Sequence, residues 1–379
     1  MLAAVLSDVK KFELRDVPRP VPGSHEVLVE ISAVGLCGTD FHIYSGEANY
    51  NLDARGRPIP LAAHPQILGH EIVGVVREVG RDVRDLKEGT AAVLDQGLNC
   101  RSSRRSEICE YCASGSSHQC RYYRELGITG LPGGFAQYVS IAATNVLPIR
   151  SSLEATSAAL TEPLACIVRA MDLCQRAGAR FSIGAQNGTR VQSVVILGAG
   201  PAGLLFTQYL RRVLGYEGLL IVSEPNQGRR ESAARFGAEA INPASEDLVD
   251  FVDRRTKGRR AELVIEASGS SAVFSQIQAL ICKQATILLY AYGYYGGDLG
   301  LLNGIHFHEP TFLLPAGGSG GFNEEQRPLT YLRALRLIEE GKIEAASLIT
   351  HRYEKLESVP RAFSGEHRRP DYVKGVVIM

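Results

Sequence analysis

Two short segments early in the chain contain residue types that together bind zinc. Cys37 begins the segment at residues 37–42, and His70 is followed directly by Glu71. A thiolate, an imidazole and a carboxylate can hold Zn²⁺ and leave a fourth position open for a substrate. Each of these residues alone is more often structural than ligating. The prediction of a zinc site therefore depends on their occurring together, in a chain that also has a dinucleotide motif.

A second group of potential metal ligands is denser. Four of the eight cysteines follow the pattern C-x8-C-x2-C-x7-C, namely Cys100, Cys109, Cys112 and Cys120. In a chain with no export signal, clustered thiols indicate metal binding rather than disulfide bonds. We predict a closed four-thiolate zinc site, because the long first spacer adds little loop-closure entropy. The alternative is a lost site with free thiols. We interpret the double arginine within residues 101–108 as a solvated surface.

A glycine motif further along the chain lies between an apolar strand and a helix. Residues 194–197 lead into a G-x-G-x-x-G sequence and the start of its helix, which contain Gly198, Gly200, Pro201, Ala202 and Gly203. The first glycine permits a tight turn, the second lets the backbone approach a pyrophosphate, and the third allows close packing of helix on strand. This context predicts a dinucleotide site. The alternative is a glycine-rich turn in a nucleotide-free domain.

Glu224 ends the second strand of this region, roughly 20 residues after the motif, where a ribose-binding acid is expected. A carboxylate there accepts hydrogen bonds from the ribose hydroxyls and repels a 2′-phosphate, which favours NAD over NADP. Arg229 and its neighbour Arg230 point the other way, because a nearby arginine can bind that phosphate. We expect NAD as the cofactor, with Arg229 among the cofactor-binding residues.

The pattern of apolar residues divides the chain into two regions. Residues 1 to about 160 contain β-branched runs between frequent turns, as at residues 27–34 and 72–79, which indicates an irregular barrel-like β domain. A helix is expected from Pro163, which suits a first helical position. From about residue 191, apolar strands alternate with helices at residues 202–214 and 229–236, as in a doubly wound α/β fold with a parallel sheet.

The composition is that of an ordinary globular protein. The chain has 379 residues, 45% of them hydrophobic, and its formal net charge is zero. These values give no electrostatic reason to expect a nucleic acid or an anionic membrane as a partner, and no apolar run reaches the length of a membrane span. The N-terminus lacks the basic start of a signal peptide, so we expect a cytoplasmic protein.

Together these motifs resemble the zinc-containing medium-chain alcohol and polyol dehydrogenases over nearly the full length of the chain. The matching pieces are residues 37–42, residues 69–71, the cysteine cluster, Glu162 with the proline after it, residues 198–203, Glu224 and residues 348–353. The resemblance implies a Rossmann NAD-binding domain at residues 165–303. It also implies a β-rich, GroES-like catalytic domain formed by residues 1–164 and 304–379, with one catalytic and one structural zinc. The cysteine cluster departs from the family pattern, which usually has only two residues after the first cysteine.

The resemblance assigns roles to single residues near the first zinc. It makes Cys37 and His70 catalytic zinc ligands, and it places Glu162 at the position of the third ligand, as in sorbitol-type enzymes. Glu71 is the alternative third ligand, and the sequence leaves this choice open. Asp40 is expected to orient the imidazole of His70 rather than to bind the metal.

The expected reaction is a hydride transfer between NAD and a secondary alcohol or ketone. A bound zinc makes the alcohol more acidic. By resemblance, Thr39 receives the proton of the alcohol and His42 passes it on. A histidine suits this last step because it titrates near neutrality. The preferred substrate is a small polar alcohol, namely a polyol, cyclitol or sugar derivative.

Two other functions compete with this interpretation. Residues 37–44 and 349–353 are reminiscent of threonine 3-dehydrogenases, so amino-alcohol oxidation is the runner-up. A zinc-ribbon binding module without catalysis belongs to a different class and predicts a basic surface, which the neutral charge does not support. The resemblance also implies a homodimer or homotetramer.

Overall fold

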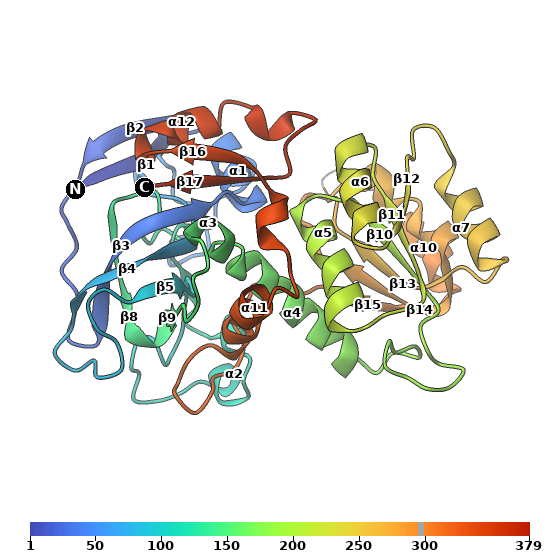
Figure 1. Cartoon of the computed structure of the whole chain (residues 1–379), viewed down its shortest axis with the longest axis horizontal. Coiled ribbons are helices and arrows are strands. Elements are labelled where there is room, and N and C mark those ends of the chain that lie inside the picture. Colours follow the sequence, from blue (N-terminus) through green and yellow to red (C-terminus); the bar gives the residue numbers. More distant parts are fainter. Residues whose placement is uncertain (295–298) are drawn as a thin grey trace. The chain divides into compact units, whose positions relative to one another are not determined.

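The computed structural model describes residues 1–294 and 299–379 and divides the chain into two compact units, shown in Figure 1. Unit 1 comprises Met1–Ala165 and Gly317–Met379, and unit 2 comprises Cys166–Ala316. Each unit has a sheet of its own. The α/β fold class with a separate β-rich domain is therefore confirmed.

The boundaries between the units can be compared with the expected ones. The first boundary, after Ala165, lies beside the expected 164/165. The second, after Ala316, lies later than the expected 303/304, because the strand β15 (Thr311–Leu313) pairs with β14 (Ile281–Leu289) in the sheet of unit 2. The assignment of a catalytic role to one unit and cofactor binding to the other stays a prediction.

A branched seven-stranded sheet forms the centre of unit 1. Its strands, in sheet order, are β16 (Ile349–Glu354), β17 (Lys374–Ile378), β3 (Glu26–Gly35), β4 (Glu71–Val79), β5 (Ala91–Leu94) and β9 (Val146–Pro148), and β8 (Tyr138–Ala142) also pairs with β3. All pairs are antiparallel except β16 with β17. The β-branched residues noted in the sequence supply much of the buried core, as an antiparallel sheet with one covered face requires.

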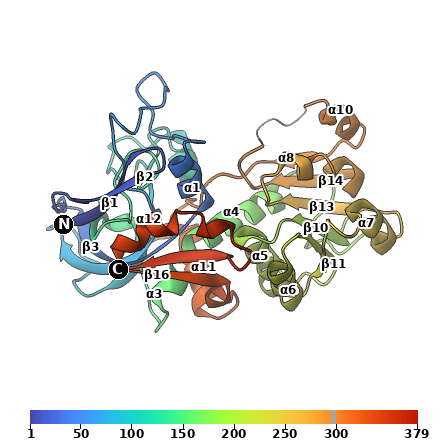
Figure 2. The same cartoon turned by 90° about the horizontal axis from the view of Figure 1, so that it is seen from above.

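The C-terminal segment returns to unit 1, as expected, and Figure 2 shows its red ribbon beside the blue strands near the N-terminus. There β17 pairs with β3. The remaining elements of unit 1 are the strands β1 (Leu2–Asp8), β2 (Lys11–Asp16), β6 (Gly97–Leu98) and β7 (Arg124–Glu125), the helices α1 (Gly38–Ser45), α2 (Glu110–Ala113), α3 (Ala155–Ala158), α11 (Leu329–Glu339) and α12 (Val359–Ala362), and the short helices η1 (Ser117–Gln119), η2 (Ala143–Asn145), η4 (Ala345–Leu348), η5 (Leu356–Ser358) and η6 (Glu366–Arg368).

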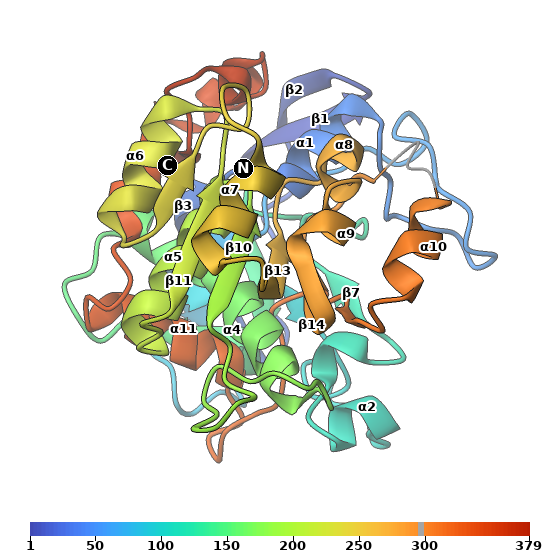
Figure 3. The ribbon, with the colours of Figure 1, turned by 90° about the vertical axis from the view of Figure 1, so that its right-hand side faces the viewer.

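Unit 2 is built on a six-stranded parallel sheet, whose central strands lie side by side in Figure 3. The strands, in sheet order, are β12 (Glu239–Ile241), β11 (Leu219–Ser223), β10 (Ser193–Leu197), β13 (Ala261–Glu266), β14 and β15. The order runs outward in both directions from β10. It therefore changes direction between β10 and β13, and this is the point where doubly wound folds bind their ligands.

Helices connect the strands of unit 2. They are α5 (Pro201–Gln208), which continues as the π-helical turn η3 (Tyr209–Val213), then α6 (Gln227–Arg235), α7 (Leu248–Thr256), α8 (Ser271–Phe274), α9 (Ile277–Leu280) and α10 (Leu301–His306). The helix α4 (Thr161–Arg176) crosses the boundary between the units. It begins two residues before the expected Pro163, which is tolerated because the first four N–H groups of a helix lack helical partners. No helix in the described part of the chain is long and apolar enough to cross a membrane.

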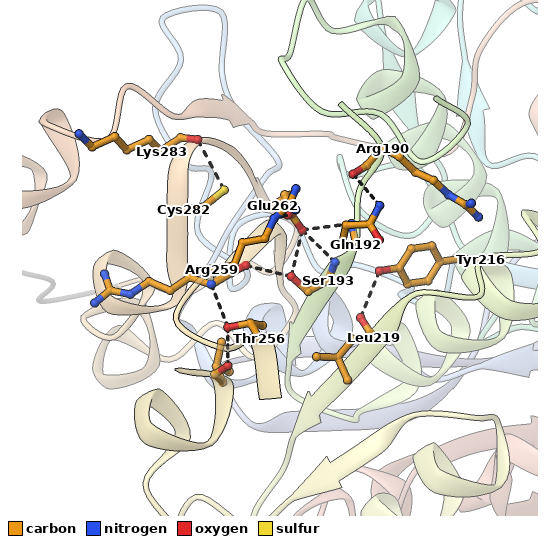
Figure 4. Close-up of polar contacts among 12 residues, drawn as sticks. Arg190, Gln192, Ser193, Tyr216, Leu219, Thr256, Arg259, Glu262, Cys282 and Lys283 are labelled. Atoms are coloured by element: carbon orange, nitrogen blue, oxygen red, sulfur yellow. Dashed lines mark hydrogen bonds and ion pairs between the residues drawn. The ribbon is translucent and has the colours of Figure 1, made fainter. Parts of the chain in front are cut away.

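A buried carboxylate joins the N-terminal ends of β10 and β13 (Figure 4). Glu262 Oε2 accepts hydrogen bonds from the backbone N–H groups of Gln192 and Ser193, at 3.1 and 2.8 Å, and from Ser193 Oγ at 2.9 Å. Arg259 Nε donates to the other oxygen at 2.6 Å. These donors compensate the buried charge. The contact fixes the N-terminal ends of these two central strands. The glycine motif follows the opposite, C-terminal end of β10.

Candidate catalytic and cofactor sites

Three predicted zinc ligands lie together in unit 1. Ligand atoms of Cys37, His70 and Glu71 all lie within 4.8 Å of one another. The pairing of β3 with β4 explains this, because Gly35 at the end of β3 is opposite Glu71 at the start of β4. Cys37 follows β3 by two residues and His70 precedes β4 by one, so the antiparallel register brings the thiol next to the imidazole.

Asp40 contacts both segments that contain these residues. Its buried carboxylate accepts the backbone N–H groups of Cys37 at 3.0 Å and Gly69 at 3.1 Å, and Oδ1 lies 3.3 Å from His70 Nδ1. Burial favours the neutral imidazole, but Asp40 and then Cys37 outweigh it and raise the pKa of His70 well above its usual value. This is the arrangement expected when a carboxylate orients a metal-binding histidine.

Lys374 is a partner of Glu71 that the sequence did not reveal. Its buried ammonium donates to the carbonyl oxygen of Leu36 at 2.8 Å and to Glu71 Oε1. The other oxygen, Oε2, is buried and has no hydrogen-bond partner among the described residues. An unpartnered buried carboxylate oxygen beside a thiol and an imidazole fits the donor set of a zinc site, because a cation there would satisfy it.

Glu162 lies in the first turn of α4 and is 5% exposed, but it is not part of the three-residue group. Gln96 Nε2 donates to its Oε1 at 3.1 Å. Burial raises the pKa of Glu162 to about 7; His70 acts in the opposite direction and Glu71 in the same one. The geometry therefore favours Glu71 over Glu162 as the third ligand, and the role of Glu162 stays a prediction.

Two further acids, the buried Asp95 and the partly buried Glu125, lie near this region, and sequence patterns did not single them out. Burial raises the pKa of Asp95 to about 7, although Ser319 Oγ donates to the carboxylate at 2.7 Å and the backbone N–H of Gly97 at 2.9 Å. Burial also raises the pKa of Glu125. The acids belong to different segments of unit 1, so no local spacing marks them as a cluster.

Thr39 and His42, the predicted proton carriers, lie on α1, which begins directly after Cys37. Cys37 Sγ is 3.8 Å from Thr39 Oγ1. His42 Nδ1 is 2.7 Å from Glu47 Oε2, and this hydrogen bond lowers the pKa of Glu47. His42 and Glu47 line a cavity of about 520 Å³ that Lys10 also lines. The structure thus places Thr39 beside the thiol, and His42 beside a carboxylate and a cavity.

The four clustered cysteines also converge. Sulfur atoms of Cys100, Cys109, Cys112 and Cys120 lie within 4.8 Å of one another, with Cys100 to Cys120 at 3.6 Å and Cys109 to Cys120 at 3.9 Å. Four thiolates around zinc, at bonds of ~2.3 Å, would be separated by roughly 3.8 Å. Backbone hydrogen bonds from Arg121 and Cys112 lower the pKa of Cys109 to about 6, while burial raises the pKa of Cys112. The sulfur spacing therefore fits a four-thiolate zinc site.

The long spacer after Cys100 is attached to the rest of unit 1. Arg101 Nη1 donates to Gln326 Oε1 at 2.6 Å. The guanidinium of Arg105 lies 3.5 Å from the ring centroid of Tyr122, close to the last cysteine. The interpretation of the double arginine as a solvated surface is therefore incomplete, because Arg105 is exposed yet stacks on an aromatic ring.

The glycine motif of unit 2 has the geometry of a strand–turn–helix connection. Gly198 has φ of +100°, which favours glycine, and Gly200 precedes α5, whose first residues are Pro201 and Ala202. A Cβ atom on Gly203 would lie 2.0 Å from the carbonyl oxygen of Gly198. The third glycine is therefore required for the helix to pack against the turn.

Glu224 follows β11 and is tied to the glycine turn. Its Oε2 accepts the backbone N–H of Ala199 at 2.8 Å, and Oε1 accepts that of Asn226 at 2.9 Å. The backbone N–H of Arg229 donates to the Asn226 side chain at 3.1 Å, which caps α6. The predicted ribose acid thus lies next to the predicted phosphate turn, as a dinucleotide site requires.

Two family descriptions match the chain. Residues 23–151 match the alcohol dehydrogenase GroES-like domain, and residues 201–333 match the zinc-binding dehydrogenase domain. Among solved structures, the chain is 29% identical to a putative zinc-binding dehydrogenase from Sinorhizobium meliloti 1021 bound to NADP, with a TM-score of 0.80 over 100% of this chain and 99% of the other.

Curated relatives cover nearly the whole chain. The chain is 33% identical to an L-threonine 3-dehydrogenase from Pyrococcus abyssi over 92% of its length and 89% of the relative. It is 29% identical to an L-galactonate-5-dehydrogenase from Escherichia coli K12, over 88% and 86% of the two chains. A sorbitol dehydrogenase from Halalkalibacterium halodurans is also 29% identical, over 90% and 89%. The chain therefore belongs to the zinc-binding alcohol dehydrogenase family.

Proposed function

We propose that this dehydrogenase oxidises a secondary hydroxyl group of a polyol, cyclitol or sugar derivative, with NAD as the hydride acceptor. The observation that carries the proposal is the convergence of Cys37, His70 and Glu71 in a chain that also has a dinucleotide turn. Relatives named for L-galactonate and sorbitol support the substrate class, because both names denote molecules with several hydroxyl groups.

Cys37, His70 and Glu71 would hold the catalytic zinc, with Glu162 close to them. A zinc ion bound there supplies a Lewis acid that makes the hydroxyl group of the substrate more acidic. Asp40 Oδ1, 3.3 Å from His70 Nδ1, would orient the imidazole, and Lys374 donates to one oxygen of Glu71. The protein thereby presents a preformed set of ligands.

Thr39 and His42 would handle the proton that the hydroxyl group loses. Thr39 Oγ1 is 3.8 Å from Cys37 Sγ, so its hydroxyl group would lie close to a zinc ion bound by that thiol. The carboxylate of Glu47 fixes the orientation of His42, which lines a cavity. A histidine in this position can pass a proton to solvent near neutral pH.

The glycine turn and Glu224 would bind NAD, which accepts the hydride. Gly198, Gly200 and the start of α5 offer backbone N–H groups for a pyrophosphate, and Glu224 offers carboxylate oxygens for the ribose. Arg229 lies in the first turn of α6, three residues after the helix cap Asn226. It would lie near the ribose. We expect NAD to be preferred, since a fixed carboxylate repels a 2′-phosphate.

The four-cysteine cluster would hold a second, structural zinc. Its four sulfur atoms fill the coordination sphere of the ion and leave no position for a substrate. Cys109, Cys112 and Cys120 belong to the short helices α2 and η1 or cap them, and Cys100 lies in the turn after β6. Helices this short are not stable by themselves. We expect this zinc to stabilise the segment rather than to take part in the reaction.

Threonine 3-dehydrogenation is the second candidate. The L-threonine 3-dehydrogenase from P. abyssi has 33% sequence identity to the chain, whereas the L-galactonate-5-dehydrogenase and the sorbitol dehydrogenase each have 29%. This difference is small, and the relatives cover similar shares of the chain. The two candidates are separated only by activity measurements with both substrate classes.

The test is NAD reduction by the purified, zinc-loaded protein with polyols, inositols, sugar acids, simple alcohols and L-threonine, with NADP as the control acceptor. Turnover with one polyol or sugar class and loss of activity in Cys37→Ser would support the proposal. Turnover with threonine alone would establish the second candidate. Retained activity in Cys37→Ser would overturn the proposed zinc site.

We also propose a homodimer or homotetramer in the cytoplasm. The strand β15 lies at the edge of its sheet, and Phe307 and Leu314, close to it in sequence, are 79% and 69% exposed. An open strand edge with exposed apolar residues favours self-association. All eight cysteines are free thiols, which suits a reducing compartment. Light scattering of the purified protein would give the number of subunits.

A further inference from the structure

We propose that Gln96 and Tyr331 are positioning residues that orient the carboxylate of Glu162 in the catalytic site. This inference rests on the proposed function, because it gives Glu162 a role beside the zinc. Neither residue belongs to a recognised motif of the sequence, and both are buried in unit 1. They form a chain of hydrogen bonds that ends on Glu162.

The first contact of this chain is between Gln96 and Glu162. Gln96 lies in the short link between β5 and β6 and is 2% exposed. Its side-chain Nε2 donates to Glu162 Oε1 at 3.1 Å. A buried amide can face a carboxylate with either its N–H₂ group or its carbonyl oxygen, and only the first orientation is favourable. Something must therefore fix the orientation of the amide.

Tyr331 supplies that constraint. It lies on α11, is fully buried, and its hydroxyl group donates to Gln96 Oε1. Because the carbonyl oxygen of Gln96 accepts from Tyr331, the N–H₂ group must face Glu162. The tyrosine thus acts on Glu162 through Gln96, from which it is separated by 235 positions of the sequence.

The nature of the donor separates Glu162 from the other candidate ligand. Glu71 is held by the ammonium of Lys374, which compensates its charge directly. Glu162 Oε1 accepts a hydrogen bond from the neutral amide of Gln96, which fixes the direction of that oxygen. The two acids therefore contribute differently to one site.

The experiment measures metal binding without turnover. Cobalt is titrated into the metal-free protein, and its absorption is recorded. The absorption of the Cys37→Ser variant, in which only the four-cysteine site binds cobalt, is subtracted from it. We expect Gln96→Leu and Tyr331→Phe each to weaken cobalt binding at the catalytic site about 10-fold or more and to change its absorption band. The double variant is expected to bind like Gln96→Leu, because the hydroxyl group of Tyr331 donates to Gln96, the residue that contacts Glu162.

Tyr353→Phe is the matched control, since Tyr353 is equally buried in unit 1 and lies on β16. This variant should bind cobalt like the wild type. The inference is overturned if Gln96→Leu binds cobalt normally, or if the effects of the two substitutions simply add. Should Gln96→Leu fail to fold, the comparison of Tyr331→Phe with Tyr353→Phe decides alone. The two variants could weaken cobalt binding as expected in a protein that oxidises none of the alcohols. That result would overturn the proposed function and leave this inference intact.

Discussion

At the scale of single residues, unit 1 contains three acids whose pKa values are raised. Asp95, Glu125 and Glu162 have raised pKa values for the same first reason, which is burial. A cavity-lining or buried acid with a raised pKa often marks a functional site. Here the acids surround the proposed zinc ligands, so the site is rich in negative charge that a cation would compensate.

Asp95 gives a testable dependence of stability on pH. Its pKa rises from an ordinary 3.8 to about 7 on folding, so between these values the folded chain holds a proton that the unfolded chain has released. By linkage, the contribution of Asp95 to the free energy of unfolding falls as pH rises from about 4 to about 7, by ~1.4 kcal/mol per unit at most, and is constant above that.

Asp95→Asn should therefore reduce this pH dependence and be relatively more stable at pH 8 than at pH 5. The amide can still accept from Gly97 and donate to Ser319 Oγ. Urea unfolding of the metal-free protein at pH 5, 6, 7 and 8 measures the effect. Parallel stability curves for the variant and the wild type would show that Asp95 does not titrate in this range.

Glu224 gives a prediction about the cofactor. Glu224→Gln keeps an acceptor for the glycine turn but removes the charge that repels a 2′-phosphate. We expect the ratio of NADPH to NADH affinity to rise about 10-fold, which corresponds to ~1.4 kcal/mol. Fluorescence titration with both dinucleotides measures it. Glu231→Gln, on the surface of α6, serves as the control and should leave the ratio unchanged.

The sequence was sufficient to select Cys37, His70 and Glu71, because thiol and imidazole types in short motifs are visible locally. It could not reveal Lys374 or Tyr331, which reach the site through contacts across 303 and 235 positions. A single buried lysine or tyrosine has no spacing that distinguishes it. The sequence also could not choose between Glu71 and Glu162 as the third ligand, since both acids lie next to predicted elements. Only the folded structure shows that Glu71 lies with Cys37 and His70.

At the scale of elements, the regular parts of unit 2 could be read closely from the sequence. The second strand, expected to end at Glu224, is β11, which ends one residue earlier, at Ser223, and the helix expected at 229–236 is α6, beginning at Gln227. Parallel strands buried on both faces give continuous apolar runs, which are easy to recognise. The helix expected at 202–214 changes at Tyr209 to a π-helical turn, which hydrophobic periodicity does not detect.

The connection from β10 to α5 allows two glycines to be compared. A Cβ atom at Gly203 would meet the Gly198 carbonyl oxygen at 2.0 Å, whereas one at Gly200 would meet no protein atom within 4 Å. Gly203→Ala should therefore lower the free energy of unfolding, by about 1–3 kcal/mol. Gly200→Ala should leave stability unchanged but weaken NADH binding about 10-fold, because its methyl group occupies the position of the pyrophosphate.

Thermal unfolding and NADH titration of both variants test this difference. Gly200→Ala is the control for folding, and Gly203→Ala is the control for a packing defect. Equal losses of stability in the two variants would contradict the assignment of packing to Gly203 alone. Undiminished NADH affinity in Gly200→Ala would contradict the proposed phosphate turn.

At the scale of the whole molecule, the two proposed cofactors are expected to stabilise different units. Zinc would be held by residues of unit 1, and the dinucleotide turn belongs to unit 2. Removal of zinc by a chelator should therefore increase hydrogen exchange at residues 97–125 and 37–71 by at least 10-fold. The parallel sheet of unit 2 should exchange as before.

Hydrogen exchange followed by mass spectrometry measures this directly. NADH added to the zinc-loaded protein should instead slow exchange at residues 198–203 and 224–229, since ligand binding stabilises the state that binds. Faster exchange throughout β10 and β13 after chelation would show that the metal stabilises both units alike. The division of roles between the units would then be wrong.

The ion pair between Glu71 and Lys374 has a consequence for the order of events during synthesis. The two residues are separated by 303 positions of the sequence, and the segment between them includes all the residues of unit 2. At ~5–20 residues per second, a ribosome needs roughly 15–60 s to make that stretch. Cys37, His70 and Glu71 thus leave the ribosome long before the ammonium that will face them. For that time the nascent acid is hydrated or holds a cation, so a metal ion can occupy the ligands before the lysine completes the site.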